Sequence, residues 1–237
     1  SLNPRSSHSA HVRSHTYYEA GETQTGISYL QDWLPDYDRS GLMHGHLSWH
    51  IALWAMETGD VEQMWRLVDA DVAPGIAEGR PINVLTDTAS ILYRAELAGL
   101  PVSKERWQQV SDYALKFFPK PGLDFADFHA ALAHAMAGNS AALETIIANP
   151  AGPAADMVRD CAEAYRAIAR QDWDEAVKHL TPLMADHARL GGSRAQRDLL
   201  DFTLLGALLK QGQAEEARRL LAMRRPVLAE TKPVSGL

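Results

Sequence analysis

Turns recur along this chain at nearly constant intervals, and each one separates two segments that have the apolar spacing of helices. Successive turns lie 38, 40, 39, 33 and 41 positions apart. They are centred on Gly21, Gly59, Gly99, Gly138, Gln171 and Gly212. A hairpin of two short helices cannot bury its apolar stripe alone, so repeated hairpins stack on one another. The spacing therefore predicts an all-α fold, a right-handed α-α superhelix of about six helical hairpins.

Apolar residues at i, i+3, i+4 and i+7 run through twelve segments, whereas strictly alternating, strand-like segments are absent. The expected helices span residues 6–20, 24–38, 43–58, 61–72, 82–98, 103–117, 125–137, 140–148, 154–170, 173–189, 193–211 and 214–224. The repeat length is nearest to the tetratricopeptide class, so we expect a tetratricopeptide-like solenoid. No segment has the composition of a linker, so residues 1–237 are expected to form a single domain. The chain begins at Ser1 without a methionine, and we expect a processed chain or a fragment of a longer protein.

The composition narrows the class of protein. Hydrophobic residues make up 46% of the chain and charged residues 22%, which is typical of a globular protein. The formal net charge of -7 argues against a nucleic-acid partner, because duplex binding normally needs a basic face. The sequence has neither an apolar stretch of membrane-span length nor a signal-type leader, so we expect a cytoplasmic protein without membrane partners. The single cysteine, Cys161, permits no internal disulfide and no thiolate metal cage.

Six of the ten histidines lie on the first helices of the first two predicted hairpins. His11 and His15 are four residues apart, as are His46 and His50, so each pair lies on one face of its helix. In a solenoid the first helices of successive hairpins stand side by side along the concave wall. The sequence therefore predicts that both pairs line one groove, with Asp87 of the third hairpin near them.

A histidine pair at i,i+4 can chelate a divalent metal ion when a carboxylate or a further imidazole completes the site. The registers argue against a shared four-histidine centre. His11 and His15 lie ten and six positions before their turn glycine, whereas His46 and His50 lie thirteen and nine before theirs. Three residues rotate a helix face by about 60°. We therefore expect no metal and no other cofactor, and histidines that either hydrogen-bond between packed helices or line a ligand groove.

A second unusual segment, residues 191–198, precedes the eleventh predicted helix. Its two glycines end one helix, Ser193 caps the next, and Gln196 completes a capping box. Capping does not account for Arg197 and Asp198. An arginine at the mouth of an inner helix can hold a carboxylate or phosphate, so a structural and a ligand-binding role both stay open here.

Three segments carry a resemblance to a known family: residues 11–21 with 26–30, residues 44–53, and residues 191–198. In them the chain resembles the tetratricopeptide repeat protein 38 family. The resemblance covers nearly the whole chain in order and spacing, and it is to the carboxyl-terminal part of the longer family members. Arg194 stands where a histidine is common in the family. The resemblance implies a helical solenoid and leaves the activity undefined, because the function of the family is itself poorly defined.

The leading functional hypothesis is a helical-repeat binding module, without enzymatic activity, whose concave groove holds a peptide of a protein partner or a small polar ligand. The expected ligand-binding residues are His11, His15, His46, Trp49, His50, Asp87, Arg197 and Asp198. An alternative is a hydrolase-like or metal-dependent enzyme that uses the groove histidines, although no nucleophile motif accompanies them. A third hypothesis is an oligomerising scaffold that forms a homodimer through an exposed apolar end.

Overall fold

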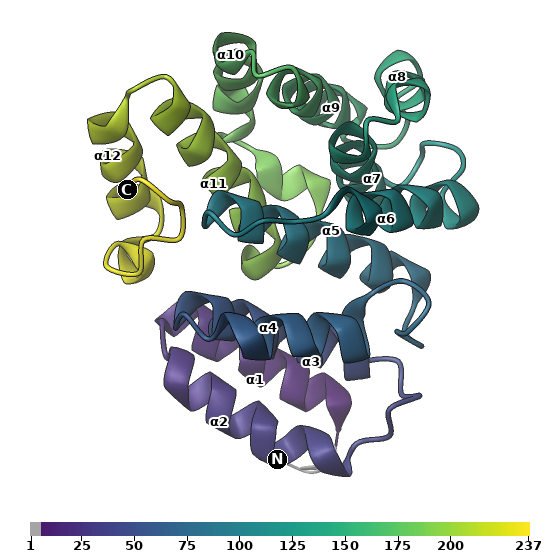
Figure 1. The fold of residues 1–237 in the computed structure, drawn as a ribbon, viewed down its shortest axis with the longest axis vertical. Helices are drawn as coiled ribbons and strands as arrows, with labels where there is room; N and C mark the ends of the chain where they lie inside the picture. Colours follow the sequence, from purple (N-terminus) through teal and green to yellow (C-terminus); the bar gives the residue numbers. More distant parts are fainter. Residues whose placement is uncertain (1–5) are drawn as a thin grey trace. The chain divides into compact units, whose positions relative to one another are not determined.

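The computed structural model describes residues 6–237. It confirms the all-α prediction, because 73% of the chain is helical and residues 6–237 contain twelve α-helices and no strand (Figure 1). The helices are α1 (Ser7–Ala20), α2 (Thr23–Trp33), α3 (His44–Glu57), α4 (Val61–Leu67), α5 (Pro81–Leu97), α6 (Lys104–Phe117), α7 (Asp124–Ala137), α8 (Ser140–Ala148), α9 (Ala155–Ala169), α10 (Trp173–Leu183), α11 (Arg194–Lys210) and α12 (Ala214–Arg224). Across the described residues, every helix is too short or too polar to cross a membrane.

Two predicted helices end early, and a proline accounts for each. The predicted helix 24–38 ends at Trp33, where a short 3-10 turn containing Pro35 takes over. The predicted helix 173–189 ends one residue after Pro182. Proline has no backbone N–H and its ring clashes with the preceding turn, so a helix rarely continues far beyond it.

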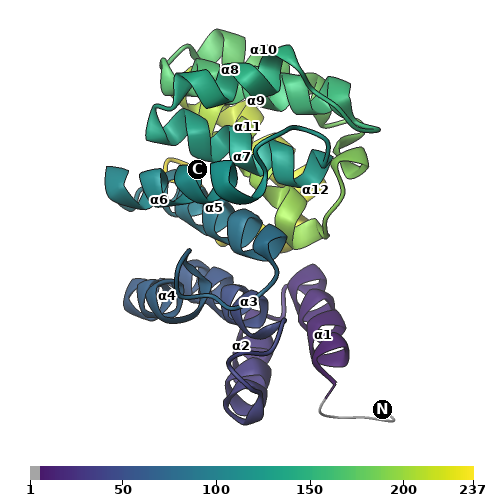
Figure 2. The same cartoon turned by 90° about the vertical axis from the view of Figure 1, so that its right-hand side faces the viewer.

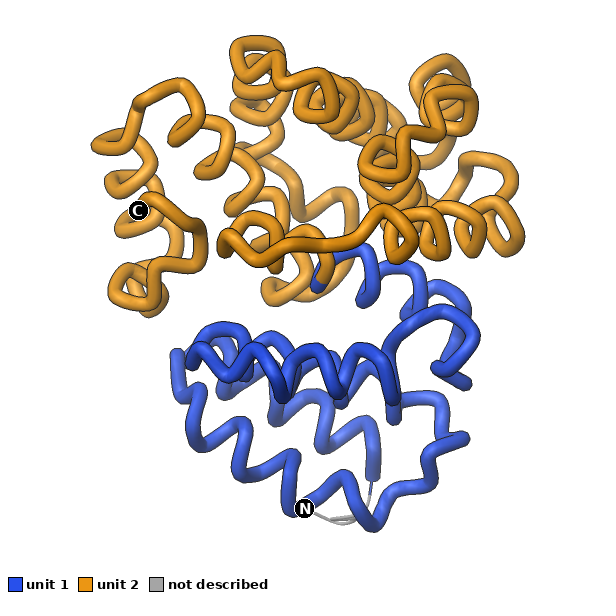
Figure 3. Tube along the Cα trace, viewed as in Figure 1, with its two compact units in different colours: residues 1–91 blue, residues 92–237 orange. Residues whose placement is uncertain are grey.

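The chain divides into two compact units, residues 1–91 and 92–237 (Figure 3). The division falls inside α5, a continuous helix, which explains why the sequence has no linker at this point.

Helix α3 is the centre of the first unit, where it contacts α1, α2 and α4 (Figures 1 and 2). Its sequence is apolar almost all round, and eleven of its fourteen residues are buried. Trp49 and Trp54 are fully enclosed. The Trp54 ring fills the space beside Gly26 of α2, where an added Cβ would meet it at 2.6 Å. Close packing therefore fixes α3 on the side of α2.

In the second unit, helices that are close in sequence pack on one another. Helix α7 contacts α6 and α9, and helix α10 contacts α9 and α11. Trp107, Phe128 and Tyr165 are the largest fully buried side chains of this unit. The end of the chain belongs to this unit, because Val234 is buried and the Ser235 N–H donates a 2.7 Å hydrogen bond to a backbone carbonyl of α5.

The turn between α9 and α10 has a residue in the left-handed backbone region without being glycine. Gln171 has a φ of 60°, close to the 77° of Gly138 at the preceding turn. An L-residue in this conformation costs about 1–2 kcal/mol, because its Cβ crowds the following carbonyl oxygen. The position thus keeps the conformation that the repeat spacing predicts, but with a strained residue.

We predict that Gln171→Gly increases the free energy of unfolding by up to about 1 kcal/mol, because glycine removes the Cβ conflict. Gln211→Gly is the matched control, since Gln211 also follows a helix but has a φ of -80°. That change should destabilise the protein. Urea unfolding followed by circular dichroism measures both variants, and an equal effect of the two would contradict the assignment of strain to Gln171.

Candidate metal centre

Four histidines of the first unit converge between α1 and α3. His11 and His15 lie one turn apart on α1, and His46 and His50 lie one turn apart on α3. Ring centroids are 4.7 Å apart for His11 and His46, and 4.7 Å apart for His15 and His50. One nitrogen from each of the four rings lies within 4.8 Å of all the others. Both predicted pairs therefore meet in one cluster, the four-histidine cluster.

The register argument against such a cluster does not hold, because the turn glycines are not equivalent reference points. Gly21 follows α1 directly, whereas Thr58 separates the end of α3 from Gly59. Neighbouring helices also differ in axial position and rotation, and the sequence does not specify either quantity. A three-residue offset along the chain is therefore compatible with convergence in space.

His11 Nε2 has two imidazole neighbours, which a single N–H can serve only as a three-centre hydrogen bond. His11 Nε2 lies 2.7 Å from His15 Nε2 and 2.9 Å from His46 Nε2. A ring nitrogen carries either one N–H or one lone pair, so it cannot donate to one neighbour and accept from the other. A cation at the centre of the cluster would be an alternative partner, because all the nitrogens then present lone pairs to it. Tetrahedral coordination at about 2.0–2.1 Å implies nitrogens about 3.3–3.4 Å apart, so the two contacts need to open by less than about 1 Å.

Asp87 of α5 fixes the tautomer of one imidazole. His46 Nδ1 donates a hydrogen bond of 2.7 Å to Asp87 Oδ2, which directs the lone pair of Nε2 into the cluster. The Asp87 side chain is 2% exposed and its Oδ1 has no hydrogen-bond partner among the described residues. Burial raises the pKa of this carboxyl, whereas His46 acts in the opposite direction. A buried carboxylate behind an imidazole is the arrangement that orients histidine ligands of metal ions.

The cluster has a buried side on α3 and a partly exposed side on α1. Burial, together with the nearby His46, lowers the pKa of His11 to about 3 and that of His15 to about 4. His50 is fully buried, and Trp49 stacks on His46 with ring centroids 5.2 Å apart. Trp49 is therefore a wall of the site that excludes water. At pH 7 the ligand nitrogens of His11 and His15 are in the uncharged form that binds metal.

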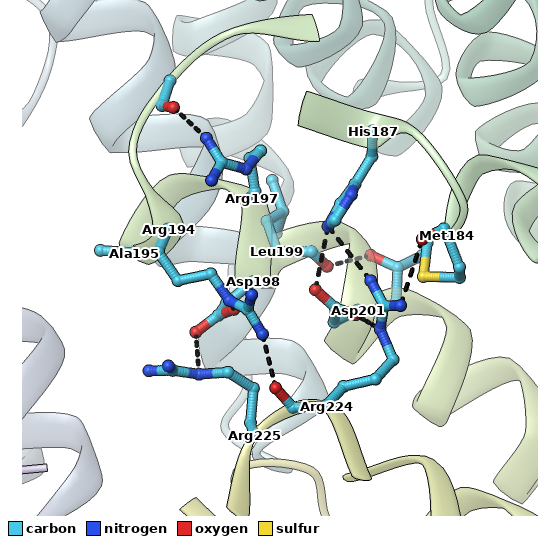
Figure 4. A network of polar contacts seen from close by, with 12 residues as sticks. Met184, His187, Arg194, Ala195, Arg197, Asp198, Leu199, Asp201, Arg224 and Arg225 are labelled. Carbon is cyan, nitrogen blue, oxygen red and sulfur yellow. Dashed lines mark hydrogen bonds and ion pairs between the residues drawn. The ribbon is translucent and has the colours of Figure 1, made fainter. Parts of the chain in front are cut away.

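Arg197 and Asp198, the other two predicted site residues, lie on α11 in the second unit (Figure 4). Asp198 is fully buried; one of its oxygens accepts a hydrogen bond from Arg194 Nε at 2.9 Å, and the other forms an ion pair with Arg225 Nε at 2.8 Å. Arg197 donates to the carbonyl oxygen of Gly192. These contacts favour the structural interpretation of the segment, because local groups already occupy both side chains.

A second buried carboxylate, Asp201, extends this network (Figure 4). It pairs with Arg224 and with His187, whose Nε2 is 3.2 Å away. These two partners hold the pKa of Asp201 below its usual value against the opposing effect of burial. Sequence reasoning did not identify this pairing, because Arg224 lies at the end of a helix whose other arginines are exposed.

No protein-family model matches the chain, and no solved structure matches it. The resemblance to the tetratricopeptide repeat protein 38 family therefore stays a prediction.

We predict that Asp198→Ala lowers the free energy of unfolding by about 3–5 kcal/mol, because it leaves the buried guanidinium of Arg225 without its carboxylate. Asp156→Ala removes an exposed ion pair with Arg189 and should have a much smaller effect. Urea unfolding measures both variants. Equal losses would contradict a structural role for the Asp198 network.

Proposed function

We propose that the first unit is a metal-binding helical module whose four-histidine cluster holds one divalent transition-metal ion. The observation that carries the proposal is the convergence of four ring nitrogens from two helices within 4.8 Å of one another. Imidazole nitrogens suit zinc, copper, nickel and iron, whereas magnesium and calcium prefer oxygen ligands.

The charges near the cluster fit a dication. Four neutral imidazoles add no negative charge, so a bound dication needs a nearby carboxylate in this buried place. Asp87 supplies that charge through His46 without entering the first coordination sphere. Burial raises the pKa of Asp87, and the attraction of a bound dication would act in the opposite direction.

A set of four protein ligands favours a structural or binding role for the ion over catalysis. Catalytic zinc sites usually keep one coordination position for water or substrate, whereas structural sites are closed by four protein ligands. Helix α1 packs mainly on α2, where Arg13 and Tyr17 contact the Tyr29 ring, and its contact with α3 depends largely on the histidines. In this proposal the ion joins α1 to α3.

The proposal includes the predicted stacking of the helical hairpins into a solenoid. Alternating short helices, hairpin turns at regular intervals and the left-handed turn residues support stacking into a tetratricopeptide-like superhelix. In such a protein the metal centre closes the first hairpins, and the other hairpins offer surface for a peptide partner.

The test is metal uptake by tag-free protein from which metal has been removed with a chelator. We expect equimolar binding of Co²⁺ with the intense visible absorption of tetrahedral cobalt, and displacement of the cobalt by Zn²⁺. The double variant His46→Ala, His50→Ala should lose equimolar uptake. His179→Ala, a partly exposed histidine of the second unit, is the control and should bind like the wild type. Equal Co²⁺ uptake by the double variant and the wild type would contradict the proposal. Failure of the wild type to bind Co²⁺ would also contradict it.

A further prediction concerns the carboxylate behind His46. Asp87→Asn should weaken Co²⁺ and Zn²⁺ binding by about 10- to 100-fold, because the amide still accepts a hydrogen bond but carries no charge. Competition with a chromophoric chelator measures the affinity. Asp32→Asn makes the same change of charge on an exposed residue of α2 and should leave the affinity unchanged. Equal affinities of the Asp87 variant and the wild type would exclude the orienting role.

A further inference from the structure

The first unit contains a cavity of about 350 Å³ that the metal centre does not use. The cavity lies among the end of α2, the start of α3 and helix α4. Its floor is apolar, formed by the buried side chains of Leu34 and Ile51. Cavities of this size and character are typical of small-molecule sites in proteins.

His44 gives this cavity a buried polar group. The residue is 7% exposed and lines the cavity, and its side chain makes no hydrogen bond among the described residues. Its nearest acidic oxygen is Asp71 Oδ1, 3.8 Å from His44 Nδ1, which is too far for a hydrogen bond. Ile51 follows His44 by two helical turns on the same face of α3, whereas His46 lies about 200° around the helix. The cavity and the four-histidine cluster are therefore on different faces of α3.

The residues that line the cavity have an excess of positive charge. Asp71 is the single acidic residue among them, and Arg39 already binds it with an N–O distance of 2.7 Å. The same Arg39 side chain donates to the carbonyl oxygen of Ala70, which holds its guanidinium in place. Arg66 of α4 also lines the cavity and forms no ion pair within residues 6–237. One guanidinium is thus available for an anionic ligand.

We propose that this cavity binds a small organic acid, a monocarboxylate with an apolar body. The carboxylate pairs with Arg66, because a guanidinium binds a carboxylate through two parallel hydrogen bonds. The apolar body rests on Leu34 and Ile51, and His44 hydrogen-bonds a polar substituent of the ligand. A monoanion matches the single uncompensated cation. This proposal does not depend on the metal centre.

The experiment uses three fluorinated probes of the same shape and different charge, followed by ¹⁹F NMR with the full chain. They are 4-fluorobenzoate, 4-fluorobenzamide and 4-fluorobenzylamine, and phenyl phosphate is added as a competitor. Measurements are made on metal-free protein, so that the carboxylate cannot coordinate an ion at the four-histidine cluster. We expect binding of the benzoate and about tenfold or greater weakening for the neutral and cationic probes.

Variants then locate the site. Arg66→Gln should weaken benzoate binding by about tenfold, and Arg66→Lys should recover most of the affinity because it keeps the charge. Arg66 is exposed, so neither change disturbs the core. Arg80→Gln is the matched control, an exposed arginine of the same unit that does not line the cavity, and it should bind like the wild type.

Three results would overturn the proposal. They are equal binding of the three probes, unchanged benzoate affinity in Arg66→Gln, and equal losses in Arg66→Gln and Arg80→Gln. Phenyl phosphate that binds more tightly than the benzoate would overturn the choice of a monocarboxylate. Because the protein is free of metal throughout, none of these results depends on whether the four-histidine cluster binds an ion.

Discussion

Helix α3 is enclosed by protein on every side, and it nevertheless carries three histidines. A buried imidazole needs a partner for its ring nitrogens, because it has lost its hydrogen bonds to water. Residues two apart on a helix point in directions that differ by about 200°, so the three rings leave α3 on two faces. His46 and His50 meet the imidazoles of α1, and His44 reaches the cavity beside α4. Both proposed sites follow from the need of these buried imidazoles for partners.

The sequence predicted the helices well because their signals are local. Apolar periodicity and turn residues placed all twelve helices, and the left-handed turn at Gln171 follows from the repeat spacing. A predicted helix boundary was wrong where the local backbone conformation departs from a regular α-helix although the apolar spacing continues. The predicted helix 61–72 ends as an α-helix at Leu67 and continues as a π-helical turn over Val68–Val72, which the apolar spacing does not reveal.

The candidate sites were harder to predict because they depend on how helices are rotated against each other. The spacing of His11 with His15, and of His46 with His50, identified the faces but not their convergence. Asp87 was expected near them, and the structure places it behind His46. His44 was not selected, although it is two residues before His46 in a His-Gly-His segment. A sequence pattern specifies a helical face, whereas the distance between two faces depends on packing of the whole unit.

The two units differ in the partners of their buried carboxylates. In the second unit Asp198 and Asp201 are each paired with arginine, so groups of the protein itself balance these two charges. In the first unit Asp87 has an imidazole on one oxygen and no partner on the other. In our proposal, a cation at the four-histidine cluster supplies the positive charge that balances Asp87.

Helix α1 presents mostly polar side chains, and its contacts with α3 include imidazole against imidazole rather than hydrocarbon against hydrocarbon. The strength of such contacts between imidazoles depends on the ions in solution as well as on the sequence. In the proposed metal-bound state the ion adds a link between α1 and α3, which makes local opening of α1 less favourable. The lifetime of the chain in a cell would then follow the supply of a trace element.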